Sequence, residues 1–273
     1  MNHLSINPSS RLGLDAYLRR PSHALLLSGE PGAGLHTVAS QLATELVRNG
    51  GRIQEITADD KGLIAISDIR SLYKVLRSKE KSKRVVLIDN ADLMSIDAQN
   101  AFLKLLEEPN PGTYFILTSH TIEDILETVR SRCRHIQLRR ITGEQSQKML
   151  DEDDVDQEQR SQLLFLASGY PAEMKRLLRS EDYFETQKKY IVDARKLLQS
   201  DRYSRLRLVL RYTDRWEAKK LLYSCQKLIL FSVMKQKSFN ALQNTDVLET
   251  TIKRIDANAH LKTQLAYLVT KLR

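Results

Sequence analysis

Residues 24–34 read ALLLSGEPGAG, and this stretch decides the fold class. Its first five residues form an apolar run of the kind that makes a strand buried on both faces, and a glycine-rich segment follows at once. Behind the glycines, Val38, Leu42 and Leu46 recur about every four residues, as on one face of a helix. A strand, a glycine loop and a helix in this order indicate a loop that cradles phosphates.

Further strand patterns follow along the chain, and helical patterns separate them. Strands are predicted at 52–57, 84–89, 114–118 and 135–138, and helices at 68–76, 98–107 and 122–130. This alternation is typical of a three-layer α/β domain with a parallel sheet. Residues 141–180 carry three short helical patterns, and residues 181–273 carry longer ones. We therefore predict an α/β domain over 1–140, a small helical lid over 141–180 and an all-α domain over 181–273.

The glycine loop departs from a working phosphate loop at the positions that carry its charge chemistry. In the pattern G-x-x-x-x-G-K-[ST], the lysine binds the β/γ-phosphates and the hydroxyl group holds magnesium. The corresponding residues here are Gly29, Gly32, Gly34, Leu35, His36 and Thr37. Leu35 offers an alkyl group where a cation is needed, His36 is interpreted as a polar loop residue, and Thr37 comes one residue late. These substitutions predict no ATP hydrolysis at this loop, while weak nucleotide binding through backbone amides stays open.

The acidic end of the predicted strand 84–89 indicates the same loss. Working ATPases of this class end that strand with Asp-Glu: the aspartate supports magnesium, and the glutamate orients and polarises the attacking water. The pair here is Asp89-Asn90. An amide has the shape of a carboxylate but cannot accept a proton, so Asn90 predicts a second defect in the same site.

Three further segments carry a family resemblance. VVLIDNAD at 85–92, AQNAFLKLLEEP at 98–109 and the motif Ser131-Arg132-Cys133 occur in the order and spacing seen in clamp-loader subunits. The chain resembles the delta-prime subunits of the bacterial DNA polymerase III clamp loader, which are AAA+ proteins, most strongly over residues 20–140. The resemblance implies an AAA+ fold for the first domain and a collar role for residues 181–273.

The resemblance also implies roles for individual residues. In that family the arginine of the Ser-Arg-Cys motif projects into the ATP site of the adjacent subunit, which makes Arg132 an arginine finger acting in trans. Ser119 takes the sensor position after the third clear strand. Cys133 is expected to be a packed residue, and Arg130 is either an interface residue or a local partner of Glu127. The arginine usual in the lid has no counterpart in residues 168–173, and no cysteine-rich zinc module is present.

The function implied is that of a subunit without its own ATPase chemistry. It would assemble with clamp-loader ATPase subunits and a delta-like subunit to load the sliding clamp on primed DNA. No cofactor of its own is expected, because ATP would be bound by the partner subunits, and no metal is expected. Two alternatives are an ATPase motor like the gamma/tau subunits, which Leu35, His36 and Asn90 disfavour, and a helical nucleic-acid-binding protein with a decayed phosphate loop.

Charge and composition bound the remaining expectations. Residues 1–180 hold 24 Lys+Arg and 24 Asp+Glu, whereas residues 181–273 hold 19 and 10, so the last domain carries the whole excess of +9. Such a domain indicates either an acidic partner, such as nucleic acid, or a lysine-rich solvated face. We expect a cytoplasmic protein without a membrane contact, because no signal peptide or apolar span is visible and the two cysteines suggest no disulfide framework.

Overall fold

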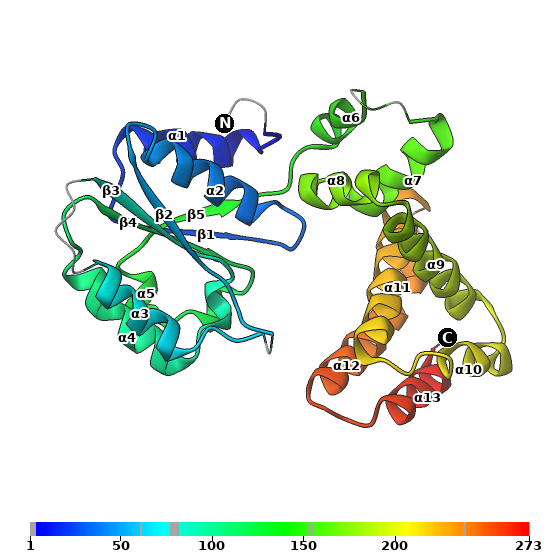
Figure 1. The fold of residues 1–273 in the computed structure, drawn as a ribbon. Coiled ribbons are helices and arrows are strands. Elements are labelled where there is room, and N and C mark those ends of the chain that lie inside the picture. Colours follow the sequence, from blue (N-terminus) through cyan, green and yellow to red (C-terminus); the bar gives the residue numbers. More distant parts are fainter. Residues whose placement is uncertain are drawn as a thin grey trace. The chain divides into compact units, whose positions relative to one another are not determined.

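The computed structural model describes residues 4–60, 62–76, 82–151, 153, 155–236 and 239–272. The chain divides into two compact units, Met1–Leu177 and Leu178–Arg273, which are described separately (Figure 1). The start of the chain at residues 1–3, on which the expectation about a signal peptide partly rested, lies outside the described residues.

The first unit alternates strands and helices along the chain. Its strands are β1 (Ala24–Gly29), β2 (Gly51–Ile56), β3 (Lys83–Ile88), β4 (Thr113–Ser119) and β5 (Arg134–Leu138). Its helices are α1 (Pro8–Arg19), α2 (Leu35–Leu46), α3 (Ile66–Leu76), α4 (Ile96–Glu107), α5 (Glu127–Arg130), α6 (Gly143–Asp151), α7 (Gln157–Ala167) and α8 (Pro171–Arg179), with 3-10 turns η1 (Ala91–Leu93) and η2 (Ile122–Asp124).

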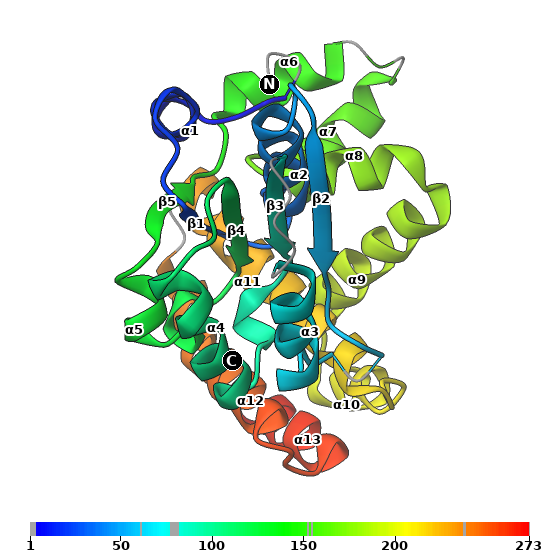
Figure 2. The same cartoon turned by 60° about the vertical axis from the view of Figure 1, so that its left-hand side comes forward.

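The five strands form one sheet in the order β2-β3-β4-β1-β5, with every neighbouring pair parallel. Figure 2 shows these strands side by side, with β2 and β5 at the two edges. Because all strands run the same way, the loops after β1, β3 and β4 all leave from the carboxyl ends of the strands, which we call the carboxyl edge of the sheet. The segments that enter β4 and β5 lie at the amino ends of the strands, on the opposite side.

Helices cover both faces of the sheet, because successive apolar side chains of a strand point to opposite faces and both sets must be buried. Leu25 and Leu27 of β1 point into a core with α1 and α2, and Ala24 and Leu26 point into a core with α3, α4 and α5. Figure 1 shows these two groups of helices on opposite sides of the sheet. The predicted three-layer α/β fold with a parallel sheet is confirmed.

Two local details of the first unit differ from the sequence-based expectations. Helix α1 was not predicted, although Asn7 caps its start by accepting a hydrogen bond from Ser9 N at 3.0 Å and Pro8 is its first residue. The helix predicted at 122–130 is instead the turn η2 followed by the short α5. Leu126 between them has an extended conformation, and its N–H donates to Gln99 Oε1 at 2.7 Å, so a tertiary hydrogen bond replaces a helical one.

The second unit is entirely helical. Its elements are α9 (Glu181–Gln199), α10 (Arg202–Val209), α11 (Arg215–Gln236), η3 (Phe239–Asn244), α12 (Thr245–Asp256) and α13 (Leu261–Lys271). Their buried aliphatic side chains share one core, which includes Leu221, Leu222 and Ile229. The exposed fractions of these three side chains are 2% or less, whereas Leu228 on the same helix is half-buried against this core. Among the described residues, no helix has the length and apolarity needed to span a bilayer.

Candidate functional site

The glycine loop after β1 has a conformation that requires glycine at several positions. Gly32 and Gly34 have φ of 89° and 90°, which L side chains rarely adopt. A side chain at Gly29 would meet the carbonyl oxygen of Leu138 at 2.9 Å. The loop closes with a hydrogen bond from Ala33 N to Glu30 O at 3.0 Å, and α2 starts directly after it. The loop therefore joins the strand and the helix between which the sequence pattern placed it.

The side chains of the three residues after the last glycine point to three different places. Leu35, the first residue of α2, is only 3% exposed and belongs to the core between α2 and the sheet. Its side chain therefore points into the core, although its position in the motif predicted a side chain that points into the loop. Burial of an alkyl group is favourable, whereas a lysine there would have to turn outward. The imidazole of His36 turns away to Glu55 of β2, with Nε2 and Oε1 2.7 Å apart. Thr37 borders a small cavity described below.

The acidic strand end is held by neighbouring groups. Thr118 on β4 donates its hydroxyl to Asp89 Oδ1 at 2.6 Å, and the side-chain amide of Asn90 donates to Asp89 Oδ2 at 3.2 Å. The N–H of Asn90 donates in turn to the Thr118 hydroxyl at 2.8 Å. Both carboxylate oxygens are therefore engaged within the chain. A magnesium ion would have to compete with these partners for its aspartate ligand.

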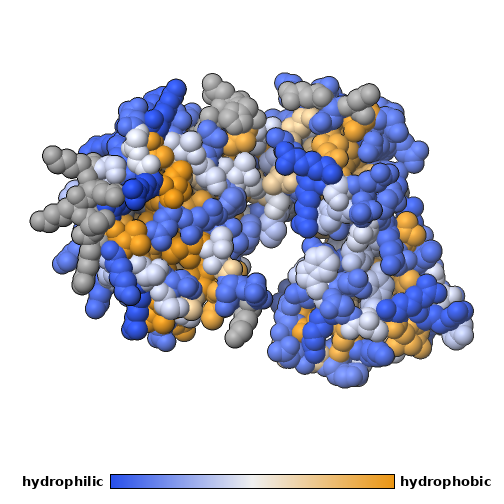
Figure 3. Space-filling model, in the orientation of Figure 1, coloured by the Kyte–Doolittle hydropathy of each residue, from blue (hydrophilic) through white to orange (hydrophobic). Residues whose placement is uncertain are grey.

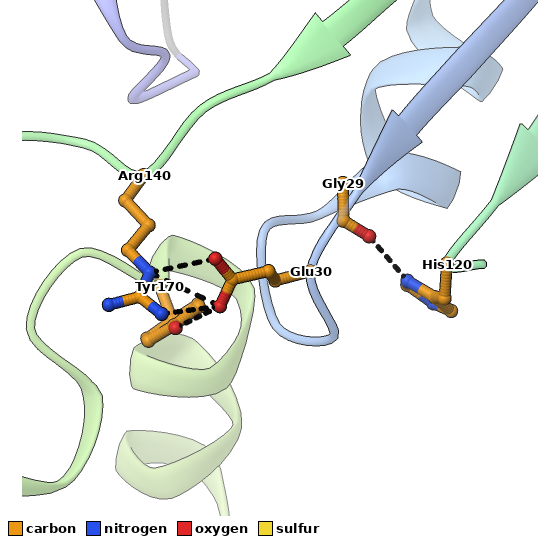
Figure 4. A network of polar contacts seen from close by, with 5 residues as sticks. All are labelled: Gly29, Glu30, His120, Arg140 and Tyr170. Carbon is orange, nitrogen blue, oxygen red and sulfur yellow. Dashed lines mark hydrogen bonds and ion pairs between the residues drawn. The ribbon is translucent and has the colours of Figure 1, made fainter. Parts of the chain in front are cut away.

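The residue in the sensor position lies beside this pair but faces inward. Ser119 is fully buried, and its hydroxyl has no hydrogen-bond partner among the described residues. The next residue, His120, reaches the loop, because its Nδ1 lies 2.8 Å from the carbonyl oxygen of Gly29 and donates to it (Figure 4). The structure thus places Gly29, Asp89, Asn90 and Ser119 at the carboxyl ends of neighbouring strands.

Lid residues of the same unit lie directly against the glycine loop. The carbonyl oxygen of Gly32 accepts hydrogen bonds from the N–H groups of Ala172 at 3.0 Å and Glu173 at 3.4 Å, at the start of α8. Figure 4 shows the side-chain contact: Glu30 forms an ion pair with Arg140 at 2.6 Å and accepts a hydrogen bond from Tyr170. We call Glu30, Arg140 and Tyr170 the lid clasp. Sequence reasoning missed it, because its members lie 110 and 140 residues apart.

A small cavity lies beside the glycine loop and the lid. The cavity there measures about 50 Å³ and is lined by Leu4, Ser5, Ala33, Gly34, Thr37, Val38, Met149, Pro171, Ala172 and Lys175. Pockets for nucleotide-sized ligands usually measure about 300–1,000 Å³. The cavity in this structure is smaller than such a pocket.

The clasp should make the stability of the first unit depend on acidity. The hydrogen bond from Arg140 holds the pKa of Glu30 below its ordinary value of 4.5, and burial raises the pKa of Tyr170 to about 12. The ionised form of Glu30 is thus favoured by folding, so its contribution is present above pH 4.5 and is lost as the pH falls through the depressed pKa.

We expect Glu30→Gln to lower the free energy of unfolding by no more than about 1 kcal/mol at neutral pH, since the pair is half exposed. The difference from wild type should shrink towards zero as the pH falls below 4.5. Urea unfolding at several pH values measures it, and a difference independent of pH would rule out the ion pair as its source.

Arg132 lies just before β5, at the amino ends of the strands and so opposite the carboxyl edge. Its guanidinium donates to Glu107 at the end of α4 at 2.8 Å and to the carbonyl oxygen of Thr128 at 3.0 Å, and its side chain is 38% exposed. Ser131 also donates to the Thr128 carbonyl, at 3.1 Å. Since the loop after β1 lies at the carboxyl edge, Arg132 is placed away from the glycine loop of its own chain.

The neighbours of Arg132 in the motif have structural environments. Burial raises the pKa of the Cys133 thiol to about 12, which suits a packed residue and not a reactive one. Arg130 forms no ion pair with Glu127 among the described residues, and its Nε is buried without a hydrogen-bond partner there. Burial lowers the pKa of His135 below its ordinary value, and the nearby charge of Arg130 lowers it further.

Gln99 joins α4 to the segment that leads to Arg132, and sequence reasoning missed it. It is 2% exposed, and its amide donates to the carbonyl oxygens of Met94 at 3.3 Å and Asp124 at 2.9 Å. With the hydrogen bond from Leu126 to its Oε1, both polar atoms of the side chain are used. A polar residue among apolar neighbours on a predicted helix face was the available signal.

Part of the first unit matches a known protein family. Residues 52–142, a third of the chain, match the family described as DNA polymerase III, delta subunit. The chain is 28% identical over 193 residues to DNA polymerase III subunit delta' of Bacillus subtilis (63% of this chain, 58% of that protein) and 27% identical over 135 residues to that of Haemophilus influenzae (41% of each).

The chain is similar to clamp-loader subunits of the delta-prime kind. It is also 32% identical over 143 residues to DNA polymerase III subunit gamma of Buchnera aphidicola, covering 45% of this chain and 39% of that one. These matches span about half the length of the curated relatives. The crystal structure of a DNA polymerase III gamma subunit-related protein from Thermotoga maritima has the same fold (TM-score 0.56, 18% identity, 95% and 99% of the two chains).

Proposed function

We propose that this chain is a delta-prime-like clamp-loader subunit that does not hydrolyse ATP and supplies Arg132 to the ATP site of a neighbouring subunit. The observation that carries the proposal is the separation of two features. The loop that would bind ATP at the carboxyl edge is closed by the chain's own lid, whereas an arginine in the family's finger motif is partly exposed at the opposite edge. A subunit built this way can serve a neighbour but not itself.

The lid clasp supports a rigid role. In a motor of this type a lid moves with the nucleotide, because the nucleotide supplies contacts between loop and lid. Here Gly32, Glu30 and their lid partners make those contacts within the protein. The lid then stays in one position without ATP, which is the behaviour of a fixed subunit around which others move.

The remaining parts of the proposal rest on the resemblance to clamp-loader subunits. The partners are ATPase subunits like gamma, a delta-like subunit and the sliding clamp, and the complex acts on primed DNA for a polymerase. The helical unit is proposed to be the collar through which the subunits assemble. The motor alternative requires a phosphate-binding cation where Leu35 stands and a water-polarising carboxylate where Asn90 stands, so we do not favour it.

The purified chain should show no ATP turnover above that of a matched blank. The physical reason is that no cation replaces the missing lysine and no carboxylate replaces the residue that polarises water. Steady-state phosphate release measures the rate, and Asp89→Ala is the control for a contaminating ATPase. Turnover at the rate of ordinary AAA+ motors that Asp89→Ala abolishes would contradict the proposal.

A further inference from the structure

Residues 139–142 join β5 to α6, so any movement of the lid against the sheet has to bend this segment. Two side chains from the start of the chain hold it in place. The hydroxyl oxygen of Ser10, which is buried, accepts a hydrogen bond from the N–H of Arg139 at 2.9 Å. The side-chain amide of Asn7 donates through Nδ2 to the carbonyl oxygen of Arg140 at 2.6 Å. The hinge of the lid is therefore bonded to a part of the chain more than 120 residues away.

A third hydrogen bond ties the same part of the chain, residues 4–10, to the lid itself. Gln145, in the first turn of α6, donates through Nε2 to the carbonyl oxygen of Ile6 at 3.0 Å. The side chain of Ile6 is only 6% exposed and belongs to the core that α1 and α2 form with the sheet. We call residues 4–10 the amino-terminal strap, because they are anchored in this core and bonded to both the hinge and the lid.

Among the described residues, the lid does not extend either apolar core of the sheet. Its buried aliphatic side chains, such as Leu163 and Met174, belong to neither of the two cores on the faces of the sheet. On the face that Figure 3 shows, apolar residues gather over the lid helices, at the upper right of the view. Because no shared core joins the lid to the sheet, the hydrogen bonds of the strap and the contacts of the lid clasp carry much of the attachment.

We propose that the amino-terminal strap locks the hinge of the lid, so that the lid keeps its position in the isolated chain. The lock acts at a different place from the lid clasp, since the clasp joins the lid to the glycine loop and the strap fixes the segment about which the lid would turn. A turning lid has to break the bonds of Asn7 and Gln145. Each bond lowers the population of the open hinge about fivefold. The lock is a property of the chain by itself and does not depend on assembly or on Arg132.

Three substitutions remove these bonds while they keep the helix caps that the same side chains form. Asn7 Oδ1 caps α1 by accepting from the N–H of Ser9, and Gln145 exchanges two hydrogen bonds with Thr142 in a capping box at the start of α6. Asn7→Asp, Asn7→Ser and Gln145→Glu preserve the caps. A carboxylate has no donor, and the serine hydroxyl is too short to reach the Arg140 carbonyl while it caps the helix. These variants therefore test the lock separately from helix stability.

The measurement is hydrogen exchange of the backbone amides of residues 139–142 in the full chain without nucleotide, followed by mass spectrometry. Exchange there reports the population of the open hinge. Each single variant should speed exchange in this segment about fivefold, and Asn7→Ser/Gln145→Glu should speed it about 25-fold. Trypsin cleavage after Arg139, an exposed residue of the same segment, gives a second readout and should rise by similar factors.

A matched control lies in the same lid. Gln157 is exposed at the first position of α7, and Gln157→Glu makes the same change from amide to carboxylate. This control should leave exchange in residues 139–142 within about twofold of wild type. The proposal is overturned if the strap variants exchange at the wild-type rate in this segment. It is also overturned if they speed exchange equally in the strands β1–β5, because the lock would then be indistinguishable from the global stability of the unit.

Discussion

Replacing Arg132 with alanine should slow ATP hydrolysis by the assembled clamp loader without preventing its assembly. A guanidinium that reaches a neighbour's γ-phosphate stabilises charge on the equatorial oxygens in the transition state, and such fingers contribute on the order of 10³–10⁵ in rate in GTPases. The ring retains the fingers of its other subunits, so total DNA-stimulated hydrolysis should fall by about tenfold, and clamp loading should fall with it.

The contact with Glu107 defines the controls for this experiment. The pair is half exposed, so its loss should change the stability of the chain by less than about 1 kcal/mol. Arg132→Lys keeps the charge but not the two-oxygen contact and should restore only part of the rate. Glu107→Ala removes the resting partner and should leave hydrolysis nearly unchanged. Normal rates in fully assembled Arg132→Ala rings would reduce Arg132 to a structural residue.

Removing the helical unit should abolish assembly. Each unit has its own core, so a chain ending at Ser180 should fold and yet fail to co-purify with its AAA+ partners. The measurement is co-purification followed by size-exclusion chromatography of reconstituted subunits. Full assembly of the truncated chain would show that the collar assignment is wrong.

A point variant distinguishes the effect of removing the whole helical unit from the effect of disrupting one surface on α11. Trp216, Tyr223 and Leu230 recur every seven residues on α11 and are 54%, 47% and 56% exposed, so they form an apolar stripe on one helix face. Leu230→Glu should weaken assembly about 30-fold or more if this stripe meets a partner's collar. Val192→Glu on α9, where the side chain is 49% exposed, is the matched control and should assemble normally.

The fold followed from the sequence because short-range patterns specify it. Buried parallel strands have continuous apolar runs, and the five predicted strands agree with β1–β5 to within about one residue at most ends. The failures lie where distant residues decide. Leu126 leaves the helical conformation for a hydrogen bond to Gln99, and no local pattern at 122–130 contains that partner.

The candidate site was predictable as a set of positions but not as a set of contacts. The motifs located Gly29, Asp89 and Arg132, because each follows or precedes a recognisable strand. The direction of the Leu35 side chain and the lid clasp depend on tertiary packing between segments more than 100 residues apart, and a linear pattern carries no such information. The contacts between the glycine loop and the lid could therefore be seen only in the structure.

The most direct test of the account compares two variants in otherwise complete clamp loaders. Asp89→Asn in this chain removes the carboxylate that a working site would need for magnesium, with little change in shape. ATP hydrolysis and clamp loading are measured for rings with wild-type chain, Asp89→Asn and Arg132→Ala. We predict that Asp89→Asn rings retain wild-type rates while Arg132→Ala rings lose about tenfold. A loss of activity in Asp89→Asn rings with normal assembly would mean that the chain uses its own nucleotide site, and the account would be contradicted.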